Sequence, residues 1–286
     1  MYDTLEKRSG ATLHHGATHN RVYLTEADKA NWDALIPEMK NLAAEKNYDK
    51  IIGRVPENAI EKFKKNGYRV EATIPKLFNG ETTGYFLADF LSKEREHCNE
   101  RELKTIESVK TIAKAANNSQ KDGHFSLPDN LVVRKLTRKD LFTVADLHQK
   151  AFKSYSFPIH KTDYLAELAA KNHEFYGLFD GDELQVSAIL KMHADESNVE
   201  IVDFATHPDI KGQNLSYYLV QEIKKELAQT GYKTIYSLVR ATSYGLNITF
   251  SKHDFVFGGT LMNNTLIRDT IESMNVWYYN VNFEEQ

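Results

Sequence analysis

Two segments of this chain match each other when the sequence is compared with itself at an offset of 184 positions. Leu35–Val55 then overlays Leu219–Val239, with seven identities in 21 positions. Each copy has apolar residues at helical spacing followed by a short apolar run, which predicts a helix and then a strand. Two related α/β halves in one chain are one interpretation. Two amphipathic helix–strand units that match only by shared pattern are the other.

Hydrophobic periodicity predicts mixed α/β structure along the rest of the chain. In the first part it predicts these strands and helices: Arg21–Leu24, Ala27–Lys46 (helix), Lys50–Val55, Glu57–Asn66 (helix), Tyr68–Ile74 and Tyr85–Phe90. In the second part it predicts Leu131–Arg134, Asp140–Phe152 (helix), Tyr164–Lys171 (helix), Phe175–Phe179, Leu184–His193, Val199–Thr206, Leu215–Gln229 (helix), Lys233–Val239, Leu246–Lys252 (helix), Phe255–Asn263 and Asn275–Tyr279.

The chain length of 286 residues is comfortable for two compact domains. Between the two patterned parts lies a charge-rich helical segment followed by the polar, turn-rich stretch 117–130, which is the best linker candidate. We therefore expect an N-terminal α/β domain over 1–91, a charged helix and linker over 92–130, and a C-terminal domain over 131–286.

Composition excludes several classes of function. The 40 acidic and 36 basic residues give a formal charge of -4, so nothing in the overall charge favours nucleic acid or an anionic membrane. The single cysteine, Cys98, rules out an intrachain disulfide and multi-cysteine metal motifs. His14, His15 and His19 lack the spacing of a metal site and are expected to be exposed, so we expect no metal. The N-terminus has no signal-like apolar run, and we predict a cytoplasmic protein.

The most informative stretch is Glu200–Val220, which reads as strand, tight turn and helix. A helix N-terminus presents unsatisfied backbone N–H groups and partial positive charge, so it can bind a pyrophosphate without a cationic side chain. Gly212 permits close approach, and Asn214 tolerates left-handed backbone angles better than most residues.

This stretch resembles the acetyl-CoA pyrophosphate loop of the GNAT superfamily of N-acetyltransferases, Arg/Gln-x-x-Gly-x-Gly/Ala. The resemblance implies a GNAT fold in the C-terminal domain, a degenerate GNAT-like half in the N-terminal one, and acetyl-CoA as co-substrate. The pantetheine is expected along Phe204, Ala205 and Thr206. The pyrophosphate is expected on the loop residues Lys211, Gly212, Gln213, Asn214, Leu215 and Ser216. Lys211, Asn214 and Ser216 depart from the family pattern.

The segment Arg240–Phe257 resembles the GNAT segment in which an asparagine contacts the cofactor, and Asn247 is the matching residue. Many GNAT enzymes have a tyrosine three residues later that protonates the leaving thiolate. Here Phe250 holds that cofactor-side position and cannot donate a proton. Tyr244, Ser243 or a water molecule are candidates for the acid, and Tyr244 is our choice.

An acceptor amine must lose a proton before it attacks, because an alkylammonium has a pKa near 10.4. Glu200, on the strand before the loop, occupies the place of the catalytic base in several GNAT members; a solvated strand carboxylate is the alternative. Asp203 is a candidate anchor for the substrate ammonium. Strand alternation puts the two carboxylates on opposite faces unless the strand bulges, as it does in GNAT enzymes.

Over both halves the chain resembles the β-lysine N-acetyltransferase family, at Lys65–Asn79, Asp203–Pro208, Arg240–Phe250 and Gly258–Tyr278, and at 84–86 and 154–159. This implies acetylation of the side-chain amine of β-lysine to N6-acetyl-β-lysine, a compatible solute or a lysine-degradation product.

Further substrate-binding candidates are Tyr155, Phe157, Arg240, Asn264 and Glu272. Tyr155 and Phe157 are equally well explained as packing residues, Arg240 as a surface residue, and the others as turn residues.

Two other functions remain open. One is a GNAT enzyme for another small amine or amino acid, a polyamine or a protein lysine. The other is a non-catalytic acyl-CoA-binding regulatory module, suggested by Asn214, Ser216 and Phe250. We expect a small-molecule amine as partner, with no nucleic acid and no membrane; a homodimer is possible.

Overall fold

The fold was examined in a computed structural model, which describes residues 3–27, 30–118, 126–152, 155, 157–267 and 269–281. Its strands are β1 (Thr4–Arg8), β2 (Ala11–Gly16), β3 (Arg21–Glu26), β4 (Lys50–Pro56), β5 (Arg69–Phe78), β6 (Thr82–Phe90), β7 (Leu131–Lys135), β8 (His173–Asp180), β9 (Glu183–His193), β10 (Asn198–Thr206), β11 (Thr234–Arg240), β12 (Val256–Ile267) and β13 (Thr270–Asn280). Its helices are α1 (Trp32–Lys46), α2 (Ile60–Lys65), α3 (Lys93–Glu96), α4 (Glu100–Asn118), α5 (Leu141–Ala151), α6 (Thr162–Lys171), α7 (Ser216–Ala228) and α8 (Tyr244–Lys252).

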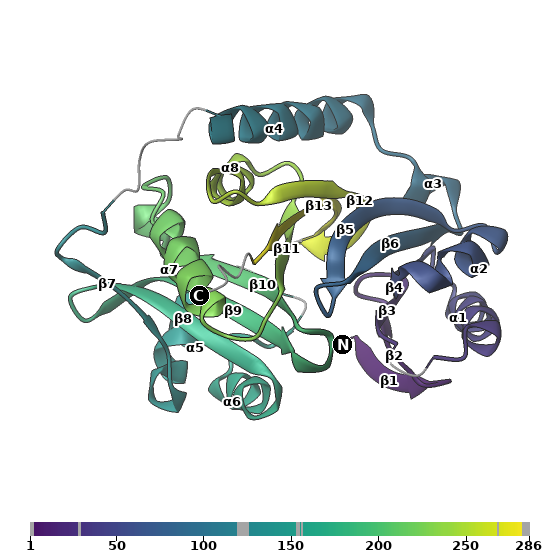
Figure 1. The fold of residues 1–286 in the computed structure, drawn as a ribbon, viewed down its shortest axis with the longest axis horizontal. Helices are drawn as coiled ribbons and strands as arrows, with labels where there is room; N and C mark the ends of the chain where they lie inside the picture. Colours follow the sequence, from purple (N-terminus) through teal and green to yellow (C-terminus); the bar gives the residue numbers. More distant parts are fainter. Residues whose placement is uncertain are drawn as a thin grey trace.

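The strands form one continuous, mixed sheet in the order β1-β2-β3-β4-β6-β5-β12-β13-β11-β10-β9-β8-β7. The mixed α/β class and most of the expected elements are confirmed. The sheet curves, and its N-terminal half (β1–β6) lies beside its C-terminal half (β7–β13), with α4 extending across both (Figure 1). No described helix is long and apolar enough to cross a membrane.

The two halves share one topology. Strands β3 and β4 pair in parallel around α1, as β10 and β11 do around α7, and both β4 and β11 are flanked by an antiparallel hairpin. The register aligns Lys50 with Thr234 and Arg21 with Asn198, offsets of 184 and 177. The stretch from the start of β10 to the start of α7 is therefore seven residues longer than the stretch from β3 to α1. Three of these residues lengthen β10 itself, and four lengthen the connection 207–215, which contains the predicted pyrophosphate loop.

The halves join where β5 meets β12, at Ala72 and Gly259. A Cβ on Gly259, whose φ is +148°, would lie 2.2 Å from the Glu71 carbonyl oxygen, so the seam requires glycine. Beside the seam, Glu71 accepts hydrogen bonds from the Met262 amide and from the Lys50 ammonium, at 2.7 and 2.8 Å. The N-terminal half thus holds the backbone of β12 with buried side chains.

Three sequence expectations need correction. Strands β1 and β2 were not predicted, and α1 begins at Trp32 rather than at Ala27. The expected exposure of the N-terminal histidines is wrong: His14, His15 and His19 are 7, 8 and 2% exposed, and burial lowers the pKa of His14 to about 4 and of His19 to about 3. Part of the predicted linker, 119–125, lies outside the described residues, as do positions 154 and 156.

Candidate active site

Strands β10 and β11 separate in the middle of the C-terminal half. Their pairing ends at Ile201 and Ser237, although the strands continue to Thr206 and Arg240. The Ser237 hydroxyl donates to the Ile201 carbonyl at 2.8 Å, so it holds the last paired position. Beyond this fork, β10 continues to Thr206 without pairing to β11 along that edge. An extended amide-bearing chain can hydrogen-bond there as an added strand does.

A bulge in β10 coincides with the fork. The register with β9 shifts between Ile201 and Asp203, so Val202 is the extra residue. Glu200 pairs with Lys191 and Asp203 with Ile189, two residues apart on β9. Because alternate residues of a strand share a face, the bulge places Glu200 and Asp203 on the same face. The two carboxylates are expected on one face only if β10 bulges, and this bulge is present.

Glu200 directly precedes Ile201, the last residue of β10 that pairs with β11. Its Oε2 accepts a hydrogen bond from the Tyr236 hydroxyl at 3.1 Å. Burial raises the pKa of Tyr236 and of Tyr23, and the nearby Glu200 carboxylate raises both further, so both phenols stay protonated. Tyr23 belongs to β3, so the N-terminal half reaches the Glu200 carboxylate.

The two cationic side chains nearest Glu200 each pair with another carboxylate. Arg54, 3% exposed, lies 3.3 Å from the Tyr236 hydroxyl and pairs with Glu196 at 2.8 Å. Lys191 pairs with Glu26 at 2.9 Å. Glu200 itself has no ion-pair partner among the residues described. Such a site favours a cationic amine over a neutral or anionic group.

Sequence reasoning missed Tyr23, Arg54 and Tyr236. The register offers one signal for them, because Tyr23 holds in β3 the position that Glu200 holds in β10. The first half therefore has a phenol where the second has a carboxylate.

Asp203 is tied to partners rather than free. Its carboxylate accepts from the Tyr155 hydroxyl at 2.7 Å and lies 2.6 Å from Nε2 of His148. The other ring nitrogen of His148 faces the Val144 carbonyl at 2.8 Å, so both nitrogens face acceptors. Although burial opposes it, Asp203 raises the pKa of His148. This pairing does not fit the predicted anchoring of the substrate ammonium by Asp203.

The loop from His207 to Leu215 has the predicted backbone. Gly212 and Asn214 have φ of +92° and +58°. The Gln213 amide donates to Ile210, and the Tyr217 amide to Asn214. Among described residues, the amides of Gly212, Asn214, Leu215 and Ser216 have no backbone partner outside α7. They lie in an exposed to half-buried segment at its N-terminus.

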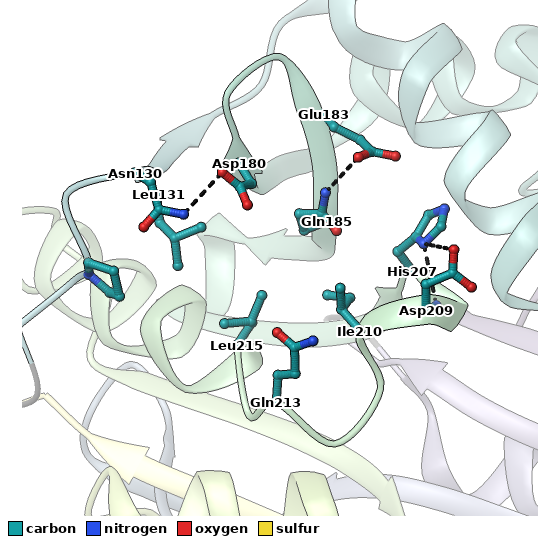
Figure 2. Close-up of a pocket in the computed structure, with 11 residues that line it drawn as sticks. Asn130, Leu131, Asp180, Glu183, Gln185, His207, Asp209, Ile210, Gln213 and Leu215 are labelled. Atoms are coloured by element: carbon teal, nitrogen blue, oxygen red, sulfur yellow. Dashed lines mark hydrogen bonds and ion pairs between the residues drawn. The ribbon is translucent and has the colours of Figure 1, made fainter.

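A pocket of about 470 Å³ lies beside this loop. Figure 2 shows the side chains of Ile210, Gln213 and Leu215 directed from the loop toward Gln185 of β9. The acidic residues Asp180, Glu183 and Asp209 line the same pocket. These carboxylates would repel a phosphate group, so the pocket itself is unfavourable for the predicted pyrophosphate.

Two of the predicted contacts in α8 do not fit the structure. Asn247 is fully buried: its amide donates to the Arg240 and Ser243 carbonyls and accepts from Asn275 and Trp277. It therefore holds the β11–α8 turn on β13 and has no group left for a cofactor. Phe250, fully buried between Phe204 and Phe255, packs in the core.

Tyr244 does not fit the role of the general acid. Its hydroxyl donates to Ser108 of α4 at 3.1 Å. Helix α4 covers α8 on the side away from the sheet (Figure 1). The hydroxyl is therefore turned away from the fork.

The remaining substrate-binding candidates lie in two places, at the end of β11 and next to the N-terminal half. Arg240 and Glu272 pair with each other through two hydrogen bonds, one of 2.8 Å, at the end of β11. Phe157 lies near the N-terminal half, with its ring 5.3 Å from that of His14. The Asn264 side chain is fully buried, and its backbone carbonyl accepts a hydrogen bond from Arg21.

A fork at a bulged strand, a carboxylate beside it and a loop of free amides define an acyl-CoA-dependent N-acyltransferase site. Residues 141–247 match the Acetyltransferase (GNAT) family. The β-lysine N(6)-acetyltransferase of Methanococcus maripaludis is 27% identical over 91% of this chain and 92% of its own length. That of Methanosarcina mazei is 26% identical over 84% and 94%.

The N-acetyltransferase YodP of Bacillus subtilis is 27% identical over 95% of this chain and 97% of its own. The structure of the ribosomal-protein-S18-alanine N-acetyltransferase from Escherichia coli superposes with a TM-score of 0.48 at 17% identity, covering 55% of this chain and 97% of that one. Residues 141–247 thus form a GNAT acetyltransferase domain, the chain is an acyltransferase, and it is similar over both halves to β-lysine N(6)-acetyltransferases.

The left-handed backbone of Asn214 gives a test of the loop. Asn214→Val places a β-branched residue at positive φ, which costs about 1–2 kcal/mol, so we expect roughly tenfold weaker binding of acetyl-CoA. Asn214→Gly, which adopts this φ freely, should bind at least as tightly as the unmodified protein. Calorimetric titration measures both, and equal affinities of the two variants would show that the loop conformation does not control binding.

Proposed function

We propose that the protein transfers the acetyl group of acetyl-CoA to the side-chain amine of β-lysine, giving N6-acetyl-β-lysine. The observation that carries the proposal is the position of Glu200, an uncompensated carboxylate at the start of the fork. The two β-lysine N(6)-acetyltransferases support the acceptor, because their similarity extends over both halves of the chain. The product would serve as a compatible solute or arise in lysine degradation.

The cofactor would be held by backbone rather than by charge. Its pantetheine would extend along the unpaired edge of Phe204–Thr206, and its pyrophosphate would accept hydrogen bonds from amides of Gly212–Ser216 at the N-terminus of α7. In this arrangement the thioester end reaches the fork, where Glu200 lies. The residues present therefore fit acetyl-CoA, and no metal enters the proposal.

Glu200 would act as the base. It takes a proton from the acceptor ammonium, directly or through water, and the neutral amine attacks the thioester carbonyl. A C–N bond forms, the C–S bond breaks, and coenzyme A leaves as a thiolate. The attacking nitrogen loses its second proton as the amide forms, and since Phe250 is buried and Tyr244 faces α4, we propose that a water molecule passes this proton to the thiolate.

One assay series tests the acceptor. The protein is incubated with acetyl-CoA and β-lysine, α-lysine, ornithine, spermidine or a lysine-containing peptide, while thiol release and product mass are followed. We expect the highest kcat/KM with β-lysine. A different best acceptor would replace β-lysine in the proposal. Calorimetric binding of acetyl-CoA without thiol release from any acceptor would establish the regulatory alternative.

A further inference from the structure

Four cationic side chains are buried in the described structure, and one of them lacks an acidic partner. Lys50, Arg54 and Arg95 pair with Glu71, Glu196 and Asp49, each at 2.8 Å. Arg21, 5% exposed, has no ion pair with any described residue, and its Nε has no hydrogen-bond partner. Burying an unpaired charge is costly, and such a charge usually serves a ligand or a functional site.

Arg21 lies on the face of β3 that meets the C-terminal half. Its guanidinium is 5.1 Å from the centre of the Tyr23 ring, and it donates to the carbonyl of Asn264 on β12. Tyr23 in turn packs in the same cluster as Tyr236, whose hydroxyl donates to Glu200. Arg21, Tyr23 and Glu200 therefore follow one another across the junction of the halves, with the unpaired cation at one end and the unpaired carboxylate at the other.

Two more buried polar atoms near Arg21 lack partners among the described residues. They are Oδ1 of Asn264, which is fully buried, and Nε2 of His14. His14 pairs with Tyr23 in the β2–β3 ladder, and Arg21 is one cause of its lowered pKa. Buried polar atoms are seldom left without hydrogen bonds, so unsatisfied ones gathered around a cation indicate a place for a polar ligand.

We propose that Arg21 binds the carboxylate of the acceptor, while Asn264 Oδ1 accepts a hydrogen bond from the amine next to that carboxylate. The site would thus select an amino acid with a terminal side-chain amine over a simple diamine. This inference rests on the proposed function and adds the residue that binds the carboxylate of the acceptor.

The spacing fits such an acceptor. Alternate residues of a strand, such as Arg21 and Tyr23, are about 7 Å apart. The six-carbon chain of a lysine isomer spans roughly 6 Å when extended, with C–C bonds near 1.5 Å. A carboxylate on Arg21 would therefore place the far amine about one strand repeat away, near the level of Tyr23.

The test compares β-lysine with 1,4-diaminopentane, which is β-lysine without its carboxylate. Arg21→Met should raise the KM for β-lysine about 10- to 100-fold, the usual effect of losing a charge-assisted hydrogen-bonded pair. It should leave acetyl-CoA affinity and turnover of 1,4-diaminopentane unchanged, and Arg21→Lys should recover part of the KM. An equal loss for both acceptors would show a merely structural role and overturn the proposal.

Thermal unfolding separates the same alternatives without activity. Arg21→Met removes an unpaired buried charge together with its hydrogen bond to Asn264, so it should lower the Tm of the ligand-free protein less than the loss of a paired cation does, but it should abolish the stabilisation that β-lysine gives. Arg95→Met is the matched control, because it leaves Asp49 without its partner and should lower the Tm. A comparable fall in Arg21→Met would contradict the proposal.

The two proposals can fail separately. If the unmodified protein acetylates 1,4-diaminopentane as well as β-lysine, the carboxylate subsite is wrong while amine acetylation stands. If it prefers another carboxylate-bearing amine, β-lysine is wrong, and the same KM comparison with that amine decides the role of Arg21. A protein that neither acetylates nor binds any carboxylate-bearing amine overturns both.

Discussion

Glu200→Gln is expected to lower kcat by about 10²- to 10⁴-fold near neutral pH, the usual contribution of a general base. The amide keeps the size of the side chain and its hydrogen bond from Tyr236, but it cannot take a proton from the acceptor. The affinity for acetyl-CoA should change little, because the cofactor is held by the fork and the loop amides. Steady-state rates and calorimetric titration measure the two effects.

The defect should shrink as the pH rises. An alkylammonium with a pKa near 10.4 deprotonates without help in alkaline solution, so a base becomes less necessary. Glu61→Gln, at an exposed ion pair of α2, is the matched control and should leave the rate unchanged. Unchanged turnover in Glu200→Gln would remove Glu200 from the mechanism.

Gly259→Ala is expected to destabilise the protein by about 3 kcal/mol or more, because its Cβ would overlap the backbone of β5. Neither the Glu71 carbonyl nor the Ala72 Cα, 2.2 and 2.6 Å away, can move without opening the β5–β12 seam. Denaturant unfolding measures the loss.

Activity should fall with stability in this variant, since the seam brings Arg21 to Asn264 and Tyr23 to Glu200. Gly231→Ala is the control, because nothing lies within 4 Å of its Cβ. If both glycine variants unfold at the same denaturant concentration, the close approach of β5 and β12 does not stabilise the fold.

The elements with a strong apolar period could be predicted from sequence, and those without it could not. Helix α7 buries Leu219, Ile223 and Leu227 at intervals of four, and this spacing predicts a helix from the sequence. Strand β1 is largely exposed, and β2 buries two histidines, so neither alternates between apolar and polar residues. Long-range pairing, and not local pattern, holds these two strands.

The candidate site likewise has some features that could be predicted from the sequence and others that could not. The positive φ of Asn214 was predictable from the residue type, and the bulge near Glu200 was implied by the resemblance to GNAT enzymes. The inward-facing amide of Asn247 was not, because its partners Asn275 and Trp277 lie about thirty residues further along the chain. Arg21 shows no sequence signal at all; what distinguishes it from Arg95 is that it forms no ion pair with a described residue.

The connection into α7, 207–215, is four residues longer than the connection into α1, 27–31, and this difference bears on stoichiometry. Among the described residues, the amides without backbone partners lie in the longer connection, and the half that contains it has a carboxylate in the register position of Tyr23. We therefore expect one acetyl-CoA per chain. The half without a loop acts as a covalently attached, inactive neighbour that completes the acceptor side, so specific activity should stay constant on dilution.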